Sequence, residues 1–428
     1  MIKQNIYIIL ITSLIFISFC LGFYLDENAA GSGGINGDIY HIWRNQETFN
    51  NYSLREALNF TAVYDISHYQ SSKMPMSYIL NKLFNPFSNN VENFRRSVFF
   101  ISCVAPFFLY LTLNQKYSGS NKYYIALISS FLFLSPYFRN SGYWALEENY
   151  GIISVILSYY FFSKLMNGNL NQKNQITQIF LLTLFSSLCI YFDQKLLVIP
   201  IICFFSIILS KKTFILKFST SVFYFIFSIP CFYIIYLWGG VLPVSDATHR
   251  NVGEIHWLHI AFSITIIAFY LLPLIFIKEE KIKLSIKDFF KSRFNLLALT
   301  IFFFFIIYLI FFNQLVLPSL GGGIAVKITL LLFDNLILQK TFFICLCFFS
   351  FLIILIFLQN NLHDFLVIFY FIILSIIITP FFQEYFDPLI ILLALTFFKT
   401  RLVINFKNVL VILGYYFILL LANNIYYF

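Results

Sequence analysis

Three carboxylates follow the first apolar segment of the chain, and their placement suits acid–base chemistry. Asp26 and Glu27 come directly after the apolar run, and Asp38 follows a glycine-rich stretch. A carboxylate within reach of a hydroxyl group accepts its proton as a general base. We expect Asp38 to do so, because it opens the aromatic amphipathic segment 40–49, whose pattern is typical of an interfacial helix. Asp26 and Glu27 precede flexible glycines, and simple solvation of acids near the end of a span is the alternative interpretation.

Two short polar turns supply cations and further acids. Arg139, Glu147 and Glu148 crowd into one hairpin between apolar runs. Asp193-Gln194-Lys195 forms another tight polar turn, for which a simple ion-paired turn is the alternative interpretation. Glutamates at the start of an apolar run are poorly solvated, which favours a functional role. The aromatic residues beside them are expected at any membrane interface.

A loop that begins with glycines has the chemistry of a phosphate site. It runs from Trp238-Gly239-Gly240 to Asp246 and His249-Arg250. Glycines let a ligand approach the backbone closely, and a guanidinium group binds phosphate oxygens through charge-assisted hydrogen bonds. His256 and His259 follow, but this spacing is a weak signal for a metal. The sequence predicts neither a metal site nor a cofactor.

The apolar runs between these segments predict an all-α polytopic membrane protein. Of the 428 residues, 60% are hydrophobic and 11% are charged, against roughly 25% charged in soluble domains. A helical span needs about 20 apolar residues, and such runs recur along the chain. Segments that are apolar throughout, such as 301–312, do not alternate as the strands of a membrane barrel do. We predict a single integral membrane domain over residues 1–428.

About thirteen spans are predicted, and residues 26–96 form the one long connection. This first outer loop contains the amphipathic stretches 40–49 and 53–62, which predict interfacial helices. Because many spans follow it, we expect the first run to be an uncleaved span. The predicted spans are 5–25, 97–113, 123–135, 148–163, 176–191, 196–209, 218–237, 257–277, 294–312, 341–358, 365–379, 388–398 and 408–422.

The charges predict the orientation of these spans. With the N-terminus inside, 17 of the 28 basic residues fall in inner loops and 15 of the 19 acids fall outside. Cytoplasmic loops carry such an excess of Lys and Arg, so the net charge of +9 reflects topology. No basic patch with interleaved aromatics predicts nucleic-acid binding. The seven cysteines all lie in apolar runs and are expected to pack there.

These loops, in this order, resemble those of the dolichyl-phosphate-glucose α-1,2-glucosyltransferases, which add the terminal glucose to the lipid-linked oligosaccharide for N-glycosylation. The family's Asp-Glu-Ile-Phe-His-Ile type sequence is matched by Asp38-Ile39-Tyr40-His41-Ile42. Its Thr-Pro-Pro-Gly-Leu-Tyr type stretch is similar to Lys73-Met74-Pro75-Met76-Ser77-Tyr78. Its Trp-Asn-Gly-Gly loop, ending in Gly-Asp-Lys-Ser-x-His, resembles the segment from Trp238 to His249. Its Arg-Tyr-Tyr-x-x-Pro type element resembles Glu384-Tyr385-Phe386-Asp387-Pro388.

The resemblance implies a GT-C fold and a membrane glycosyltransferase. Such an enzyme moves one sugar, with inversion, from a polyprenyl-phosphate sugar to a lipid-linked glycan or another surface acceptor. Two departures bear on the sugar: Gly37 replaces the first acid of the family's pair, and Asp193-Gln194-Lys195 stands where the family has an Arg-Gln-Thr-Asn type turn. The Phe-rich composition and the missing long loops favour a bacterial inner-membrane protein, with its site on the extracytoplasmic side and a lipid carrier other than dolichol.

The implied reaction needs a base and cations beside the lipid phosphate. We expect Asp38 as the base, helped by Asp26 and Glu27. Because phosphate leaves without a general acid, a second catalytic carboxylate is not required. The cations expected at the phosphate are Arg139, Lys195, His249 and Arg250. All predicted substrate-binding residues are His41, Lys73, Arg139, Glu147, Glu148, Gln194, Lys195, Trp238, Asp246, His249, Arg250, Glu384 and Tyr385.

Other membrane functions fit less well. A flippase for lipid-linked glycans would need a cation-lined central cavity, and basic residues within the predicted spans are nearly absent. An O-antigen polymerase would carry its long outer loop late in the chain, whereas here that loop comes first. A structural or accessory membrane protein would leave the clustered outer acids unexplained.

Overall fold

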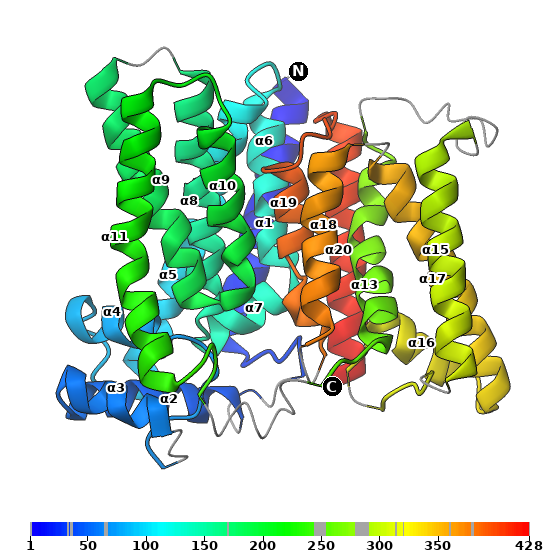
Figure 1. The fold of residues 1–428 in the computed structure, drawn as a ribbon, viewed down its shortest axis with the longest axis horizontal. Helices are drawn as coiled ribbons and strands as arrows, with labels where there is room; N and C mark the ends of the chain where they lie inside the picture. The colour runs from blue at the N-terminus through cyan, green and yellow to red at the C-terminus, as the bar shows by residue number, and fades with distance from the viewer. Residues whose placement is uncertain are drawn as a thin grey trace. The chain divides into compact units, whose positions relative to one another are not determined.

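The computed structural model describes residues 2–31, 34, 37–63, 67–168, 171–243, 254–278, 291–312, 315–319, 321–358, 361–377 and 381–427. Within these ranges the chain forms 18 α-helices and no strand (Figure 1). It divides into two compact units. The first comprises Met1–His249 with Leu413–Phe428, and the second comprises Arg250–Ile412.

The first unit begins with the N-terminal helix and contains the whole first outer loop. Its elements are α1 (Ile2–Tyr24), α2 (Asp38–Asn51), α3 (Leu54–Val63), α4 (Met76–Phe84), α5 (Val91–Lys116), α6 (Lys122–Ser129), the 3₁₀ helix η2 (Ser130–Leu134), α7 (Pro136–Tyr143), α8 (Glu148–Asn167), α9 (Gln172–Phe192), the 3₁₀ helix η3 (Gln194–Leu197), α10 (Val198–Ile208) and α11 (Phe214–Trp238).

The second unit holds the later helices. They are α13 (Leu258–Ile275), α15 (Arg293–Phe311), α16 (Ile324–Leu332), α17 (Leu336–Leu358), α18 (Leu362–Ser375), the 3₁₀ helix η4 (Gln383–Tyr385) and α19 (Leu389–Leu395). The last helix, α20 (Phe406–Tyr427), starts in the second unit and continues into the first from Leu413.

Eight of the described helices are long and apolar enough to cross a membrane, as expected for an all-α membrane protein. They are α1, α5, α9, α11, α13, α15, α17 and α20. Three further apolar segments, 122–134, 194–208 and 362–375, are shorter. Each of the thirteen predicted segments overlaps a described helix, but thirteen as a number of spans stays a prediction. Helix α16 lies outside all of them, because nine residues are too few to be recognised as a span.

Side-chain caps explain where several helices begin. Asn90, Asn121 and Asn171 each accept a hydrogen bond from a backbone N–H in the first turn of α5, α6 and α9. Ser135 does the same for α7, with Pro136 at its first position. A side-chain oxygen satisfies an N–H that has no partner within the helix, and proline lacks that N–H. The polar residues between the apolar runs therefore also fix the helix starts.

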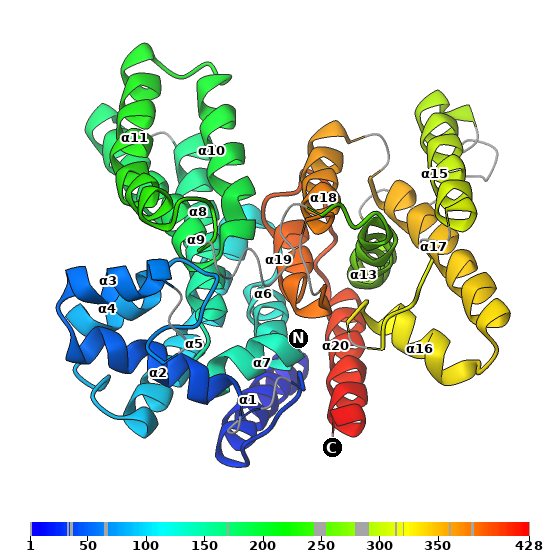
Figure 2. The ribbon, with the colours of Figure 1, turned by 60° about the horizontal axis from the view of Figure 1, so that its bottom comes forward.

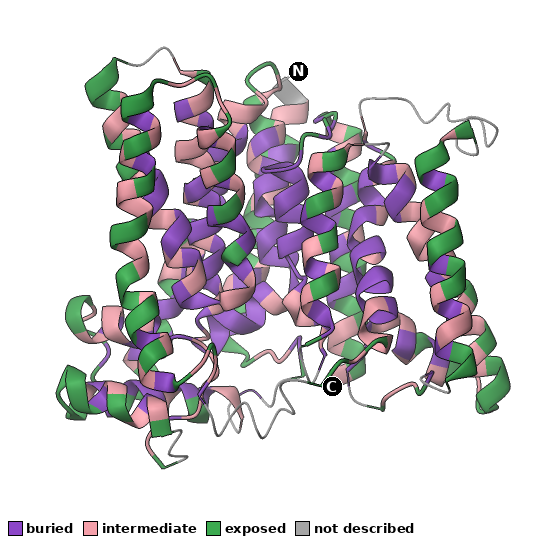
Figure 3. Cartoon of the chain, in the orientation of Figure 1, coloured by how far each residue is buried: buried purple, intermediate pink, exposed green. Residues whose placement is uncertain are grey.

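The core of the first unit is aromatic around α1. Phe19 is fully buried, and its ring centroid lies 4.5 Å from that of Phe133 on η2. It lies 5.2 Å from the ring centroids of Phe99 on α5 and Tyr143 on α7. Ring pairs of this kind add to the free energy gained by burial. Helix α8 packs against both α5 and α9, and buried residues line the inward sides of these helices (Figure 3).

Helices α2, α3 and α4, which we call the platform, close one end of the first unit. Figure 1 shows α2 and α3 lying crosswise to α11 at its C-terminal end, and Figure 2 shows the three platform helices together. Helix α2 packs against α3 and α4. The indole Nε1 of Trp238, the last residue of α11, donates to Thr61 Oγ1 on α3 over 2.9 Å. The platform is therefore joined to the end of a spanning helix.

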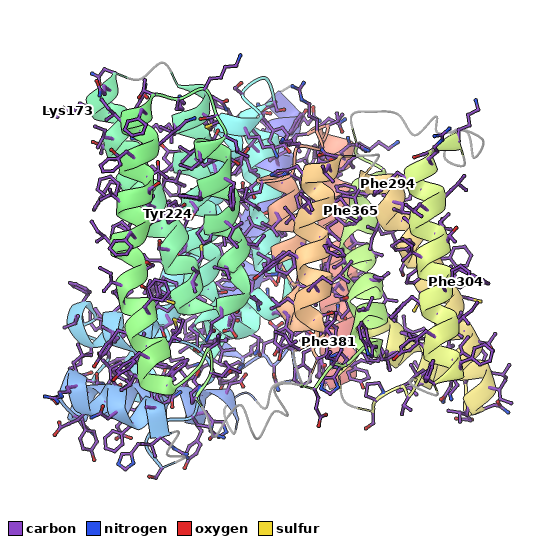
Figure 4. All side chains as sticks on the ribbon, viewed as in Figure 1. Lys173, Tyr224, Phe294, Phe304, Phe365 and Phe381 are labelled. Atoms are coloured by element: carbon purple, nitrogen blue, oxygen red, sulfur yellow. The ribbon has the colours of Figure 1, made fainter. Side chains whose placement is uncertain are left out.

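The loops predicted to lie inside gather at the opposite end of this unit. Lys173 opens α9 at the end away from the platform (Figure 4). Lys212 lies at this end too, because its Nζ donates to the Leu165 carbonyl oxygen over 2.9 Å. Lys173 and Lys212 are thus at the end of the helices opposite to the platform.

In the second unit, α13 packs against α16, α17, α18 and α19. Phe294 of α15 meets Phe365 of α18 edge to face, with ring centroids 5.4 Å apart (Figure 4). Gln383 on η4 is buried, and its Oε1 accepts from the backbone N–H of Ile324 at the start of α16 over 2.8 Å. Its Nε2 donates to the Tyr270 hydroxyl on α13 over 2.9 Å. One amide therefore ties η4, α13 and α16 together.

Candidate active site

Asp38 lies half-buried at the amino end of α2, where α7 reaches it. Asn140 Nδ2 on α7 donates to Asp38 Oδ2 over 3.3 Å. The position is the first residue of the helix, where the helix dipole attracts negative charge. The amide of Asn140 therefore orients one carboxylate oxygen of Asp38, the residue predicted to be the general base.

The segment that leads from α1 to Asp38 is closely packed where the structure describes it. Ala29 and Ala30 are buried. A Cβ on Gly31 would overlap the ring of Tyr427 on α20, and one on Gly34 would lie 3.1 Å from the ring of Trp144. Glycine therefore allows close packing at these two positions, and the flexibility of the stretch stays a prediction.

Asp26 is held by a buried arginine. Arg95 on α5 donates from Nη2 to Asp26 Oδ1 over 2.5 Å, and from Nε to the Tyr143 carbonyl oxygen over 2.6 Å. Its guanidinium carbon lies 4.4 Å from the ring centroid of Trp144 and 4.6 Å from that of Phe23. Arg95 is 7% exposed, so the carboxylate of Asp26 supplies the charge that lets this cation be buried.

Glu27 is held by a second buried arginine. Arg139 on α7 is 2% exposed; its Nε donates to Glu27 Oε1 over 3.0 Å, and its Nη2 pairs with Glu27 Oε2. The same guanidinium donates to the carbonyl oxygens of Phe133 and Ser18, each over 3.0 Å. Asn424 on α20 donates to Glu27 Oε1 over 3.1 Å. Arg139, predicted to bind a phosphate, is therefore engaged by the protein.

A second polar cluster joins the first outer loop to the α7–α8 turn. Lys73 pairs with Glu148 and lies 3.9 Å from Glu147 Oε1. Glu147 is 3% exposed. Its Oε1 accepts from Ser71 Oγ over 3.4 Å, and its Oε2 accepts from the Tyr78 hydroxyl over 3.3 Å. Three residues predicted as substrate ligands, Lys73, Glu147 and Glu148, are thus brought together.

The turn that opens η3 completes this cluster. Gln194 Nε2 donates to the Ser72 carbonyl oxygen over 2.8 Å. Lys195 Nζ pairs with Asp193 Oδ2 at 2.8 Å, and both side chains are nearly buried. The first outer loop is therefore bonded both to the α7–α8 turn and to the turn before η3. Lys195, which was predicted to bind phosphate, pairs with a carboxylate of the protein.

The clustered charges shift the acidity of these groups. Burial lowers the pKa of Lys73, but the nearby carboxylates, Glu148 first among them, outweigh burial and raise this pKa well above its usual value. Burial raises the pKa of Glu147, an effect that Lys73 partly offsets. Burial also raises the pKa of Tyr78. Lys73 is therefore a permanent cation, and the Tyr78 hydroxyl remains a donor.

Trp238 packs beside this cluster. It forms a small apolar core with Met74, Tyr191 and Ile234, and Met74 directly follows Lys73 in the chain. Its side chain is 1% exposed, so its described contacts are with the protein core and with Thr61.

His41 lies on the exposed side of α2, three residues after Asp38 and therefore on the same side of that helix. Its ring meets that of Tyr40 edge to face, with ring centroids 5.6 Å apart.

Glu384 and Tyr385 belong to the second unit, where the centroid of the Tyr385 ring lies 6.0 Å from that of Phe382. The remaining predicted ligands, Asp246, His249 and Arg250, lie outside the described residues.

Sequence reasoning missed Arg95, Asn140 and Asn424, which hold the three acids. Arg95 was assigned to the first outer loop because the predicted span begins at residue 97. In the structure, α5 begins at Val91 and therefore includes Arg95. An arginine inside an apolar helix is a usable signal, because it needs a partner there. In the part of the chain that the structure describes, no three His, Cys, Asp or Glu side chains gather as metal ligands.

Comparison with family models, with curated proteins and with solved structures finds no match to this chain. The evidence for a function therefore consists of the residues and their geometry.

Proposed function

We propose that this chain is a membrane glycosyltransferase of the GT-C type. It would transfer one sugar from a polyprenyl-phosphate sugar to a lipid-linked glycan or another surface acceptor. The observation that carries the proposal is Asp38, a half-buried acid at the start of α2 with one oxygen held by Asn140. Asp26 and Glu27 are each engaged by a buried arginine. We propose that these two acids chiefly position α1 against α5 and α7.

The proposed reaction is a single displacement. The acceptor hydroxyl oxygen attacks the anomeric carbon on the face opposite the phosphate, and Asp38 accepts the hydroxyl proton. The new C–O bond forms as the bond to the phosphate oxygen breaks, and the polyprenyl phosphate leaves with that electron pair. Phosphate leaves without being protonated, so one carboxylate is sufficient. Attack from the opposite face inverts the anomeric configuration.

The donor phosphate needs positive charge beside it. We propose His249 and Arg250 for this role, since their loop follows the end of α11, which is joined to the platform. Lys73 is a third candidate, because its side chain is 24% exposed and its charge is permanent. Arg139 and Lys195 also have a carboxylate partner, as Lys73 does, but their side chains are only 3% and 14% exposed. We propose that they chiefly position those carboxylates.

We further propose that the long apolar helices cross a bacterial inner membrane, that the shorter predicted segments cross it or form a re-entrant pair, and that the platform faces outward. The supporting observation is that Lys173 and Lys212 lie at the end of the first unit away from the platform. Basic loops are retained on the cytoplasmic side.

The test uses Asp38→Asn, which keeps the size of the side chain and removes the proton acceptor. The purified protein in lipid nanodiscs is supplied with polyprenyl-phosphate hexoses and a lipid-linked glycan extract, and release of polyprenyl phosphate is measured. Turnover should fall by roughly 10² to 10⁴ while donor binding persists. The control is Glu47→Gln, an exposed acid on the same helix, and it should retain full turnover.

Three other outcomes would contradict the proposal. Wild-type turnover in Asp38→Asn together with an inactive Asp26→Asn would mean that Asp26, just after α1, is the base. Equal losses in Asp38→Asn and Glu47→Gln would show that the effect is not specific to Asp38. Movement of a labelled lipid-linked glycan across the bilayer without sugar transfer would favour a flippase.

A further inference from the structure

Helix α4 is built with its polar side inward. Its buried residues are Ser77, Tyr78 and Asn81. The Tyr78 hydroxyl donates to Glu147 Oε2 over 3.3 Å, and Asn81 Nδ2 donates to the Tyr150 hydroxyl on α8 over 3.2 Å. The Tyr78 and Asn81 side chains of this helix are therefore hydrogen-bonded to the protein.

Apolar residues at the C-terminal end of α4 and in the turn after it are exposed. Leu83 is 58% exposed, Phe84 is 76% exposed and Phe87 is 60% exposed, with Pro86 exposed between them. Figure 3 shows exposed residues at the outer end of the α4 region. We call these four residues the wedge. An amphipathic helix in water has the opposite arrangement, with polar residues outside.

The one charged side chain of α4 is turned away from the wedge. Lys82 Nζ donates to the carbonyl oxygens of Phe49 and Tyr52 at the C-terminal end of α2. These carbonyls have no partner within α2 and carry the negative end of the helix dipole, so they suit a cation. The wedge therefore presents apolar atoms without a charge among them.

Helix α3 presents charged and polar side chains instead. On α3, Arg55, Glu56 and Asn59 are exposed, while Ala57 and Thr61 are buried. Exposed polar residues of this kind can be solvated by water. The exposed side of α3 at Asn59 is therefore a suitable comparison for the wedge.

The wedge continues the lipid-facing side of α5. On that helix, which is long and apolar enough to cross a membrane, Phe100, Val104 and Phe107 are 65%, 41% and 56% exposed. Asn85, between Phe84 and Pro86, donates from Nδ2 to Ser97 Oγ on α5 over 2.7 Å. Ser97 lies one helical turn before Phe100. The wedge is therefore at the depth where the lipid-facing side of α5 begins.

An ion pair marks the boundary of that depth. Arg96 Nε donates to Glu92 Oε1 over 3.0 Å on the exposed side of α5. Arg96 is one turn before Phe100, so its cation falls at the level of lipid headgroups when Phe100 meets acyl chains. Aromatic side chains are favoured at this level of a bilayer.

We infer that the wedge inserts into the bilayer at the boundary between headgroups and acyl chains, beside the start of α5. Lipid is the proposed occupant because the apolar surface is continuous with that of a spanning helix and carries no charge. Insertion would fix the height of the platform relative to the membrane. The inference depends on membrane embedding alone and does not require the proposed enzymatic activity.

The test places a tryptophan in the wedge. Phe84→Trp and Phe87→Trp are each reconstituted in phosphatidylcholine nanodiscs, with or without bromine on the upper part of the acyl chains. The emission of the unsubstituted protein, which has four native tryptophans, is subtracted. The added emission should be largely lost in brominated lipid and should resist aqueous iodide. Asn59→Trp on α3 is the matched control and should show the opposite pattern.

Two results would overturn the inference. Quenching of the added tryptophan by iodide but not by brominated lipid would place the wedge in water. Protection from both quenchers would mean that protein covers the wedge, either a second copy of the chain or another partner. Phe87 lies outside α4, so Phe87→Trp gives an answer even where a substitution within the helix disturbs folding.

Discussion

Gly22 on α1 allows the Glu27 carboxylate to approach Arg139 on α7 closely. A Cβ at this position would overlap the Glu27 carboxylate, and it would lie 2.5 Å from both the Arg139 guanidinium and the Tyr143 hydroxyl. The Tyr143 hydroxyl also donates to the Phe19 carbonyl oxygen on α1 over 2.6 Å. A side chain at Gly22 must therefore displace a buried ion pair or a buried hydrogen bond.

Gly22→Ala should lower the free energy of unfolding by about 1 to 3 kcal/mol, the usual cost of overpacking. The measurement is thermal unfolding of the purified protein in detergent. Gly414→Ala on α20 is the control, because a Cβ there meets nothing within 4 Å. Alanine is favoured over glycine within a helix, so the control should be neutral or slightly stabilising. Equal melting temperatures for the two variants would show that α1 and α7 are not packed this closely.

The three acids of the candidate site could be proposed from the sequence, but the residues that bind them could not. Asp38 follows from the motif and from the amphipathic segment that it opens, both of which are local in sequence. Arg95 and Arg139 lie 69 and 112 residues from the acids that they hold. No periodicity or spacing connects residues so far apart. Only the packing of α1 against α5 and α7 brings them together.

At the scale of elements, apolar runs predicted the helices well because burial in lipid requires length and composition alone. Short elements escaped, as α16 did. The platform shows a subtler limit: segments 40–49 and 53–62 were recognised by their amphipathic pattern and correspond to α2 and α3. The pattern of α4 is equally amphipathic, but sequence alone cannot say that its polar side is the buried one.

Asp364 links two elements of the second unit. It lies in the first turn of α18 and is fully buried. Its carboxylate accepts from the backbone N–H groups of Lys399 and Thr400 over 2.8 and 2.9 Å, and from Thr400 Oγ1 over 2.7 Å. The acid therefore fastens the turn after α19 to the start of α18.

Asp364→Asn should lower the free energy of unfolding by about 2 to 4 kcal/mol. An amide has one acceptor oxygen where the carboxylate has two, so at least one charge-assisted hydrogen bond is lost and a donor is left buried. Thermal unfolding in detergent measures the change. Asp334→Asn is the control, since Asp334 is exposed. Its free energy of unfolding should equal that of the unsubstituted protein within experimental error. A similar loss in both variants would argue against the link.

For the molecule as a whole, ion pairs of the first unit lie near the platform, and Lys173 and Lys212 lie at the opposite end. Acids at the platform end meet basic residues, as in Asp26 with Arg95, Glu27 with Arg139 and Asp193 with Lys195. Pairing lowers the cost of holding acids close to the apolar helices. The sorting also matches the sequence-based orientation, in which most acids lie outside and most lysines inside.

The orientation can be tested with two cysteines in the first unit. Asn51 ends α2 on the platform, and Gly119 lies between α5 and α6, where a side chain meets nothing within 4 Å. In spheroplasts, a cysteine at Asn51 should react with a membrane-impermeant maleimide, because the platform is predicted to face outward. A cysteine at Gly119 should react only after permeabilisation, since Lys116 and Lys122 flank it and hold that loop inside.

The unsubstituted protein is the control for this labelling, because the chain has seven cysteines of its own. Of these, Cys345 is exposed on α17, inside a predicted span where lipid excludes an aqueous reagent. Its background should therefore be low in intact spheroplasts. Labelling of the cysteine at position 119 without permeabilisation would show that the predicted topology is inverted, so that Asp38 faces the cytoplasm. An outward-facing glycosyltransferase would be excluded in that case, whereas the contacts that hold Asp38 beside Asn140 would be unaffected.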